Sequence, residues 1–499
     1  MNTNKIKIGW GEVSLVPEGR KISLAGQFYE RISDTVETPI SVTAMALECG
    51  DEQAIFCSCD LGGTSHFLLE AVRERLAKIS DFPTEKLIIS AIHTHTSIKY
   101  ANCSDSTSTS GSSLDVLKTL MPDVKYEELV SYSGDDLLAG EEAFDFLAER
   151  IALAAKAAWD TRAEAAYATG FGRAAIGMCR RVCYSDGSAK MWGDVDTATF
   201  TELEGGNDSG IELIFTYTPD KKLTGVVANV SCPAQVLEHR SFISSDYFGK
   251  VKEMLRKEFG EDIYLLGLCS AAGDQCPRDM IRWVEPETPI NDPNIVRENP
   301  KYRKADPSMF DIKGCTLAAR RITNEILYAY ENVEEYVTET ELIHKPMKID
   351  MPLRRVTPEE TQKAIEKIEQ FAKENAGKPI TFKDNARMHV YAGTVARSKI
   401  QEKIDLIEIE VHVLRLGDIA FATNPYELFL DYGNQIRARS KAAQTFLIQL
   451  CCGSFGYLPT EKAEKGSHYS AYVSSGTVGH AGGELLVRKT LTEINDMWD

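Results

Sequence analysis

Hydrophobic positions in the first part of the chain predict strands and helices in alternation. Residues 40–50 and 52–63 are two short, mainly apolar runs that predict a β-hairpin. Residues 65–80 place apolar side chains at helical spacing behind Ser65, a favourable N-cap residue. The run 88–92 is short and almost wholly apolar, as in a buried strand. Strand, helix and strand in this order indicate an α/β fold.

Similar patterns recur later and change character near residue 335. Residues 141–160 and 357–375 have helical periodicity, and the second stretch carries Glu and Lys on its exposed face. Residues 404–425 predict two strands joined at Gly417-Asp418, a dipeptide found in hairpin turns. His412 alternates with two glutamates there, so we expect it on a solvated strand face. The whole pattern predicts large mixed β-sheet lobes flanked by helices.

Composition limits the kinds of partner. The 499 residues carry a formal net charge of −18, which argues against a nucleic-acid partner because phosphate binding needs a basic surface. No apolar run approaches the roughly 20 residues of a membrane span. The first residues lack the apolar core of a signal peptide, and the 12 cysteines are scattered, as reduced buried thiols would be. We therefore expect a cytoplasmic protein, and the sequence is compatible with a homo-oligomer.

Two of the nine histidines, His93 and His95, follow the apolar run 88–92. In a strand, residues i and i+2 point the same way, with Cα atoms about 6.5–7 Å apart. One imidazole can then bind a metal ion while the other faces a substrate, at the strand end where α/β sheets bind ligands. A bare His-x-His is equally typical of two hydrogen-bonded loop histidines. Residues 101–140, which begin with a Ser/Thr-rich stretch, predict a long irregular loop.

Five later stretches carry polar residues near the ends of expected strands. They are "GMCRRVCYSDG" (177–187), "ANVSCPAQVLEHRSFISSDYFGK" (228–250), "LGLCSAAGDQCPRD" (266–279), "FATNPYELF" (421–429) and "GSFGYLPTEKAEKGSHYSAY" (453–472). With "SAIHTHTS" (90–97), and in this order, they resemble the catalytic domain of the neutral/alkaline non-lysosomal ceramidases. The resemblance covers roughly residues 5–280 and 410–490, without the family's C-terminal sandwich domain. No single motif is specific, but six in order are.

The resemblance implies a zinc site. Its implied ligands are His93, Cys232, Glu427 and Tyr457. The implied catalytic residues are His95 and Arg180, which would stabilise an oxyanion, and Tyr469 near the substrate. We also expect Gln235, Asp274 and His480 to contact the substrate. Three or four N and O ligands with an open position turn a bound water into a nucleophile near neutral pH.

Departures from the family pattern leave two points open. Cys232 stands where the family has a histidine; cysteine binds zinc well, but a packed thiol fits the same position. His239 is a second candidate for that ligand, although Glu238 and Arg240 beside it favour a solvated loop. The family's Gly-Pro after the histidine pair is also absent.

These observations lead to an expected activity. Residues 1–334 should form the main α/β lobe with the His-x-His site, and residues 335–499 should complete the same catalytic unit. The expected reaction is zinc-dependent hydrolysis of an amide or related bond in a small soluble substrate, because an acidic surface does not favour membrane lipid. One alternative is a metal-assisted enzyme acting on glycosides or esters. The other is a non-catalytic binding protein whose metal site has decayed.

Overall fold

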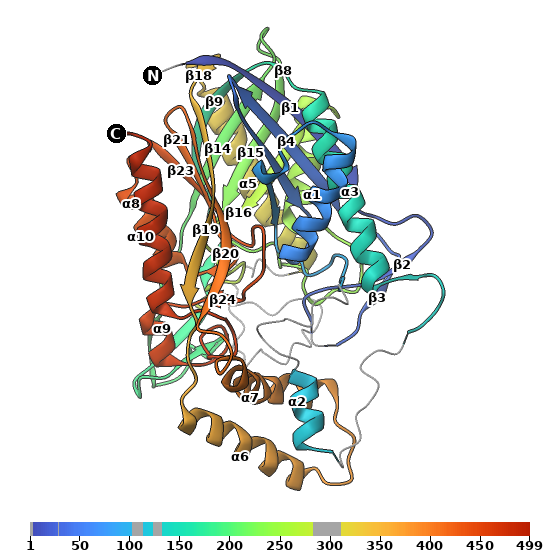
Figure 1. Cartoon of the computed structure of the whole chain (residues 1–499), viewed down its shortest axis with the longest axis vertical. Coiled ribbons are helices and arrows are strands. Elements are labelled where there is room, and N and C mark those ends of the chain that lie inside the picture. Colours follow the sequence, from blue (N-terminus) through green and yellow to red (C-terminus); the bar gives the residue numbers. More distant parts are fainter. Residues whose placement is uncertain (1–2, 28, 102–112, 123–131, 283–310) are drawn as a thin grey trace.

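Three mixed β-sheets organise the protein (Figure 1). The computed structural model describes residues 3–27, 29–101, 113–122, 132–282 and 311–499. The first sheet has the order β18 (Glu339–Thr340), β1 (Asn4–Ser14), β4 (Ser41–Cys49), β5 (Glu52–Cys59), β6 (Leu87–Ala91), with β8 (Ala163–Glu164) also on β1. The second has the order β16 (Tyr264–Cys269), β15 (Leu223–Val230), β14 (Gly210–Tyr217), β9 (Ala166–Arg173). The third has the order β19 (Leu342–Pro352), β20 (Leu406–Leu416), β21 (Ile419–Thr423), β23 (Gln444–Ile448).

Each sheet is antiparallel except for one parallel pair at its edge, namely β5–β6, β15–β16 and β21–β23. A parallel pair needs a crossover, and a helix supplies it each time. These helices are α1 (His66–Ile79), α4 (Asp246–Phe259) and α8 (Leu430–Arg439). The fold therefore contains three β-α-β units, and the carboxyl ends of their strands are where α/β proteins gather ligands.

The sheets share one hydrophobic core and carry helices on their outer faces. Phe56 of β5, Leu266 of β16 and Phe421 of β21 belong to the same buried cluster. Each such side chain contributes about 1.5–3 kcal/mol of burial free energy. Outside this core, α3 (Gly140–Asp160) packs on the first sheet, α5 (Asp311–Glu331) on the second and α10 (His480–Asp496) on the third.

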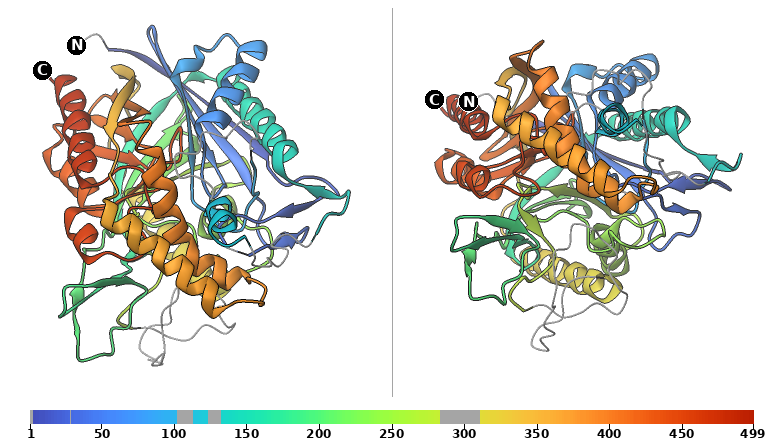
Figure 2. Two further views of the ribbon diagram at one scale, coloured as in Figure 1. Left: turned by 60° about the horizontal axis from the view of Figure 1, so that its bottom comes forward. Right: turned by 90° about the horizontal axis from the view of Figure 1, so that it is seen from below.

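Smaller elements lie around this core. Three helices form a satellite at one end of the molecule, where α6 (Pro358–Glu374) and α7 (Phe382–Ile400) run side by side and contact α2 (Ser113–Leu120), as Figure 2 shows. The short elements are β2 (Lys21–Ser23), β3 (Ile32–Ser33), β7 (Leu137–Leu138), β10 (Met178–Cys179), β11 (Arg181–Tyr184), β12 (Ala189–Met191), β13 (Phe200–Leu203), β17 (Gln275–Cys276), β22 (Glu427–Leu428), β24 (Tyr457–Leu458), α9 (Glu461–Gly466) and the 3₁₀ turn η1 (Thr84–Lys86). In the described residues no helix is long and apolar enough to cross a membrane.

Most of the predicted elements are confirmed. Strands β4 and β5 form the expected hairpin, and β20 and β21 form the second one. The Ser65 hydroxyl caps α1 by accepting a hydrogen bond from the Leu68 N–H at 3.1 Å. Part of the expected loop 101–140 contains α2, whereas 102–112 and 123–131 lie outside the described residues. The division at residue 334 stays a prediction.

Two expectations of solvent exposure are wrong. His412 is fully buried: it hydrogen-bonds His344 of β19, and it lies against Glu410, whose carboxylate pairs with Arg73 of α1. The His239 side chain is also buried: it is 3% exposed and lies 3.8 Å from the Asp311 carboxylate. Polar alternation in one strand does not reveal what packs over it.

Candidate active site

Strand β6 delivers the histidine pair. All five of its residues are buried beside β5, so the apolar run continues directly to the strand's carboxyl end. His93 then adopts a left-handed backbone with φ of 69°. Its Nδ1 lies 2.5 Å from the Gly62 carbonyl oxygen, which can only accept, so Nδ1 carries the hydrogen. The Nε2 lone pair of His93 is thereby directed inward.

Two other side chains lie close to the Nε2 lone pair of His93. His93 Nε2 lies 3.2 Å from His95 Nε2 and 3.5 Å from Glu427 Oε2. Burial lowers the pKa of His93 to about 4, although the nearby Glu427 raises it. His93 is therefore neutral at physiological pH, the form in which an imidazole binds a metal.

Glu427 and Tyr457 come from two short parallel strands, where β22 pairs with β24 and sets Glu427 opposite Tyr457. The chain at position 273 lies against the backbone of β22, and only glycine fits there, because a Cβ would lie 2.2 Å from the Glu427 carbonyl oxygen. The Tyr457 side chain hydrogen-bonds the Glu427 side chain, and its hydroxyl accepts a hydrogen bond from Arg180 Nη2 at 3.2 Å. Burial, followed by the nearby Glu427, raises the pKa of Tyr457 well above its ordinary value.

The adjacent arginines have different surroundings. Arg180 donates from Nη2 to the Gly273 carbonyl at 2.9 Å, and its buried Nε has no hydrogen-bond partner among the described residues. Arg181 is fully buried and pairs through both carboxylate oxygens with Glu204. It also donates to the Tyr469 carbonyl at 2.9 Å, which holds the Tyr469 ring 5.6 Å from that of Tyr457. Arg180 thus presents charge to the site, whereas Arg181 fixes the chain around it.

Glu238 is a site residue that the sequence does not single out. Its carboxylate is 4% exposed and lies 3.4 Å from His95 Nδ1. Burial raises the pKa of Glu238, against the lowering effect of Arg278, Arg180 and Arg31. Its Oε1 has no hydrogen-bond partner among the described residues. Its position was the one indication in the sequence, because Glu238 follows the carboxyl end of β15, where ligands gather in α/β proteins.

A cavity of about 230 Å³ opens beside these groups. Its polar lining is Gln27, His95, Arg180, Gln235, Glu238, Tyr457 and Tyr469. Gly26, Met191 and Trp192 form part of the wall. Gly26 is required there, because a Cβ would lie 2.3 Å from the His95 ring and its φ is +89°. Larger hollows, such as one of about 550 Å³ next to β9, contain none of these lining residues.

Five of the expected site residues are not part of the cavity lining. His93 and Glu427 lie next to the lining residues His95 and Tyr457, whereas the other three make different contacts. The buried Cys232 thiol donates to the Pro233 carbonyl at 3.5 Å and belongs to no group of three clustered ligand atoms in the described chain. Asp274 is buried and accepts a hydrogen bond from the Leu430 N–H at 2.9 Å. His480 begins α10 and pairs with Glu464 at 2.8 Å. Their predicted roles stay predictions.

The donor set fits a zinc ion in part. A tetrahedral site with bonds of about 2.0–2.1 Å has edges of about 3.3–3.4 Å, close to the 3.5 Å between His93 Nε2 and Glu427 Oε2. The Gly62 carbonyl fixes the tautomer that such a ligand needs. His93, Glu427 and Tyr457 could therefore hold Zn²⁺.

These features define an α/β protein whose three crossover units gather His, Glu, Tyr and Arg side chains around one small cavity. No protein-family model and no curated protein sequence matches the chain. Among solved structures it is similar to a neutral ceramidase from Pseudomonas aeruginosa, with a TM-score of 0.66, 14% identity, and coverage of 99% of this chain and 75% of the other. It is also similar to a ceramidase complexed with C2, with a TM-score of 0.64, 12% identity and the same coverage. The expected ceramidase-like fold is confirmed, and at this identity the likeness concerns the fold alone.

Proposed function

We propose that the protein is a zinc-dependent hydrolase that cleaves an amide or related bond in a small substrate. The observation that supports this most is the meeting of His93, Glu427 and Tyr457 beside a cavity that Arg180 and His95 line. Zinc bound there would lower the pKa of a water to about 7. The ceramidase-like fold agrees with hydrolysis but does not by itself assign it.

The chain's own residues divide the remaining work. Arg180 keeps its positive charge in a buried position and has Nε available, so it would stabilise the negative charge that develops on the substrate oxygen. His95 would contact the same oxygen. Glu238, with a raised pKa and a buried Oε1, would donate the proton that the leaving group takes when the bond breaks.

The cavity also favours a small substrate. Its volume of about 230 Å³ lies below the roughly 300–1,000 Å³ of typical ligand pockets. Seven polar side chains in its lining suit a polar molecule with hydrogen-bond donors and acceptors. A cytoplasmic location and a homo-oligomer remain parts of this proposal.

Metal content and turnover of two histidine variants test the site, with a panel of amides, esters and glycosides as substrates. His93→Ala should contain one zinc ion per chain fewer than the parent and should lose all measurable turnover. His95→Ala should keep its zinc and lose turnover by a factor of about 10²–10⁴. His66→Ala, at an exposed helix start, is the matched control and should change neither quantity.

Each contrary result has a distinct meaning. Full zinc retention by His93→Ala would overturn the ligand assignment. Turnover of glycosides or esters but no amide would favour the first alternative activity. Parent protein that contains no metal and turns over nothing would favour a binding protein. Cys232→Ser should weaken zinc binding if the thiol is a ligand and leave it unchanged if the thiol only packs.

A further inference from the structure

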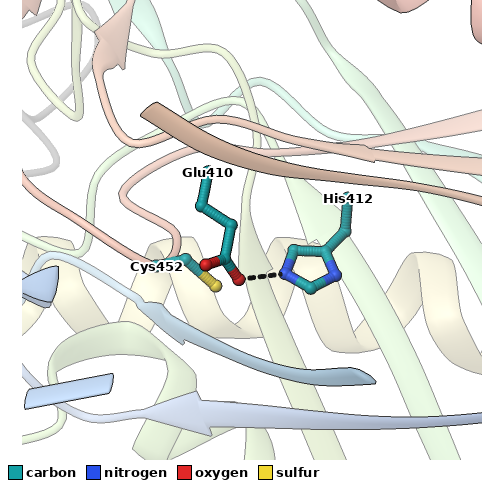
Figure 3. A group of neighbouring side chains, drawn as sticks. All are labelled: Glu410, His412 and Cys452. Atoms are coloured by element: carbon teal, nitrogen blue, oxygen red, sulfur yellow. Dashed lines mark hydrogen bonds and ion pairs between the residues drawn. The ribbon is translucent and has the colours of Figure 1, made fainter. Parts of the chain in front are cut away.

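Away from the cavity, one group of buried side chains has no part in the proposed reaction. In the described chain it is the one set of His, Cys, Asp or Glu residues with three ligand atoms within 4.8 Å of one another (Figure 3). Its members are Glu410 and His412 of β20 and Cys452, which follows β23. His412 and Cys452 are 0% and 2% exposed.

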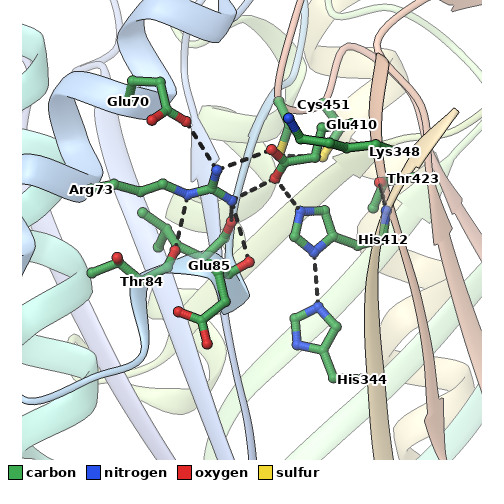
Figure 4. A network of polar contacts seen from close by, with 12 residues as sticks. Glu70, Arg73, Thr84, Glu85, His344, Lys348, Glu410, His412, Thr423 and Cys451 are labelled. Carbon is green, nitrogen blue, oxygen red and sulfur yellow. Dashed lines mark hydrogen bonds and ion pairs between the residues drawn. The ribbon is translucent and has the colours of Figure 1, made fainter. Parts of the chain in front are cut away.

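A relay of imidazoles orients His412 (Figure 4). His344 Nδ1 lies 3.0 Å from the Gln53 carbonyl oxygen, which can only accept, so a neutral His344 offers Nε2 as an acceptor. His412 Nδ1 lies 2.8 Å from that nitrogen and must donate to it. His412 Nε2 then faces Glu410 Oε1 at 2.9 Å, so either a second proton or a metal cation is required between them.

Glu410 is held as a metal-binding carboxylate often is. Arg73 of α1 donates to both of its oxygens, at 3.0 and 2.5 Å. The same guanidinium also donates to the Thr84 carbonyl at 3.0 Å, which fixes its position. A carboxylate has about four lone-pair sites, so one remains for a cation on the side of His412. Such support from neighbouring groups is typical of metal ligands.

The segment that carries Cys452 has a strained backbone. Leu450 and Cys452 both have left-handed backbones, with φ of 52° and 58°. This conformation costs a non-glycine residue roughly 1–2 kcal/mol and is concentrated at functional positions. It leaves Cys451 Sγ 3.8 Å from Cys452 Sγ. Cys451 lies outside the group of three ligand atoms, so its thiol contacts Cys452 and is not a ligand of the group.

We propose that Glu410, His412 and Cys452 hold a structural Zn²⁺ ion in a site separate from that at His93. The Glu410 carboxylate and the Cys452 thiolate balance the two positive charges of the metal. His412 and Cys452 are buried and the Glu410 side chain is 11% exposed, which suits a structural ion better than a catalytic one. Neither the fold comparison nor the proposed hydrolysis requires this ion.

The position of the site indicates what the ion does. The Cys452 N–H donates to the Ile89 carbonyl at 2.9 Å, and the Ala91 N–H donates to the Leu450 carbonyl at 3.2 Å. The cluster is therefore tied to β6, which leads to His93. The same segment continues to Tyr457. A metal here would join the strand that carries one proposed ligand to the loop that carries another.

The test removes the His93 site first, so that the two sites are counted separately. His93→Ala protein, purified from zinc-supplemented medium without chelators, should retain one zinc ion per chain by mass spectrometry. Adding Cys452→Ala should remove that ion, while adding Cys49→Ala, a buried thiol on β4, should not. The cobalt-loaded His93→Ala protein should show a thiolate-to-cobalt charge-transfer band, which Cys452→Ala abolishes.

Two results would overturn the proposal. One is His93→Ala protein without metal and without the cobalt band, in which case the buried group is a metal-free thiolate–imidazolium pair. The other is full retention of metal after Cys452→Ala. If that variant fails to fold, His412→Gln takes its place, with circular dichroism to confirm the fold. Failure of the hydrolase proposal would instead appear as unchanged zinc content and turnover in His93→Ala alone.

Discussion

The cavity beside His93 and the cluster around Cys452 are built from the same stretches of chain, yet they treat buried charge differently. In the cluster, Arg73 and His412 both contact Glu410, and these contacts lower the pKa of that carboxyl to about 2 against the raising effect of burial. At the cavity, burial raises the pKa of Glu238, whose Oε1 has no hydrogen-bond partner in the described residues. The cluster pairs its charged side chains with one another, whereas the cavity leaves hydrogen-bond donors and acceptors available to a ligand.

The difference follows from geometry. The cluster is sealed between β20, β5 and α1, so every polar atom that remained unpaired would cost about 1–3 kcal/mol. The cavity lies where strands end and loops diverge, so a ligand or water can complete its hydrogen bonds. Pairing therefore separates a region that stabilises the fold from one that would bind a substrate. Three substitutions test this separation.

Removing the cluster carboxylate should have the largest effect on stability. Glu410→Ala leaves Arg73 and His412 buried without their anion and should lower the free energy of unfolding by about 3–5 kcal/mol. Glu408→Ala, two residues earlier at the exposed beginning of the same strand, is the control and should cost under about 1 kcal/mol. Denaturant unfolding measures both. If both variants lowered the free energy of unfolding equally, the ion pairs of the cluster would contribute no more stability than those at the surface.

Asp274, near the cavity, should give a pH-dependent effect. Burial raises its pKa to about 6 from an ordinary value of 3.8, although the Leu430 N–H lowers it. Between these values the folded chain binds more protons at Asp274 than the unfolded chain, so its contribution to stability falls as pH rises. The stability of the parent relative to Asp274→Asn should drop by roughly 3 kcal/mol from pH 4 to pH 7.

Unfolding curves of both proteins across this pH range measure the change. The exposed Asp51→Asn serves as the control for the loss of a carboxyl group. A difference that stays constant with pH, or that grows in the opposite direction, would contradict the assigned shift and with it the contrast between the two regions.

Tyr457→Phe should have the smallest effect on stability. It removes a hydroxyl that accepts from Arg180 and hydrogen-bonds Glu427, and one such bond contributes about 0.5–1.5 kcal/mol. Turnover should fall more clearly, by at least about 10–100-fold, because both partners belong to the proposed site. Parallel kinetic and unfolding measurements decide the point. A large loss of stability with intact turnover would place Tyr457 among the purely structural residues.

Local sequence patterns determined most of the elements. The hairpin β4–β5, the Ser65-capped α1 and the buried β6 each depend on the period of nearby side chains and on one capping residue. The same logic placed His93 at a strand end, since an apolar run that stops must reach the edge of its sheet. Hydrophobic period and capping are local properties, so the sequence alone carries them.

Only the tertiary structure decided which polar residues are buried and which of them meet. His412 has the alternating neighbours of a solvated strand, but His344 and Arg73 approach from other elements and close over that face. Glu238 likewise resembles surface charge until β6 brings His95 to its side. Burial is set by what packs across a residue from distant parts of the chain, and the periodicity of a single segment contains no record of that partner.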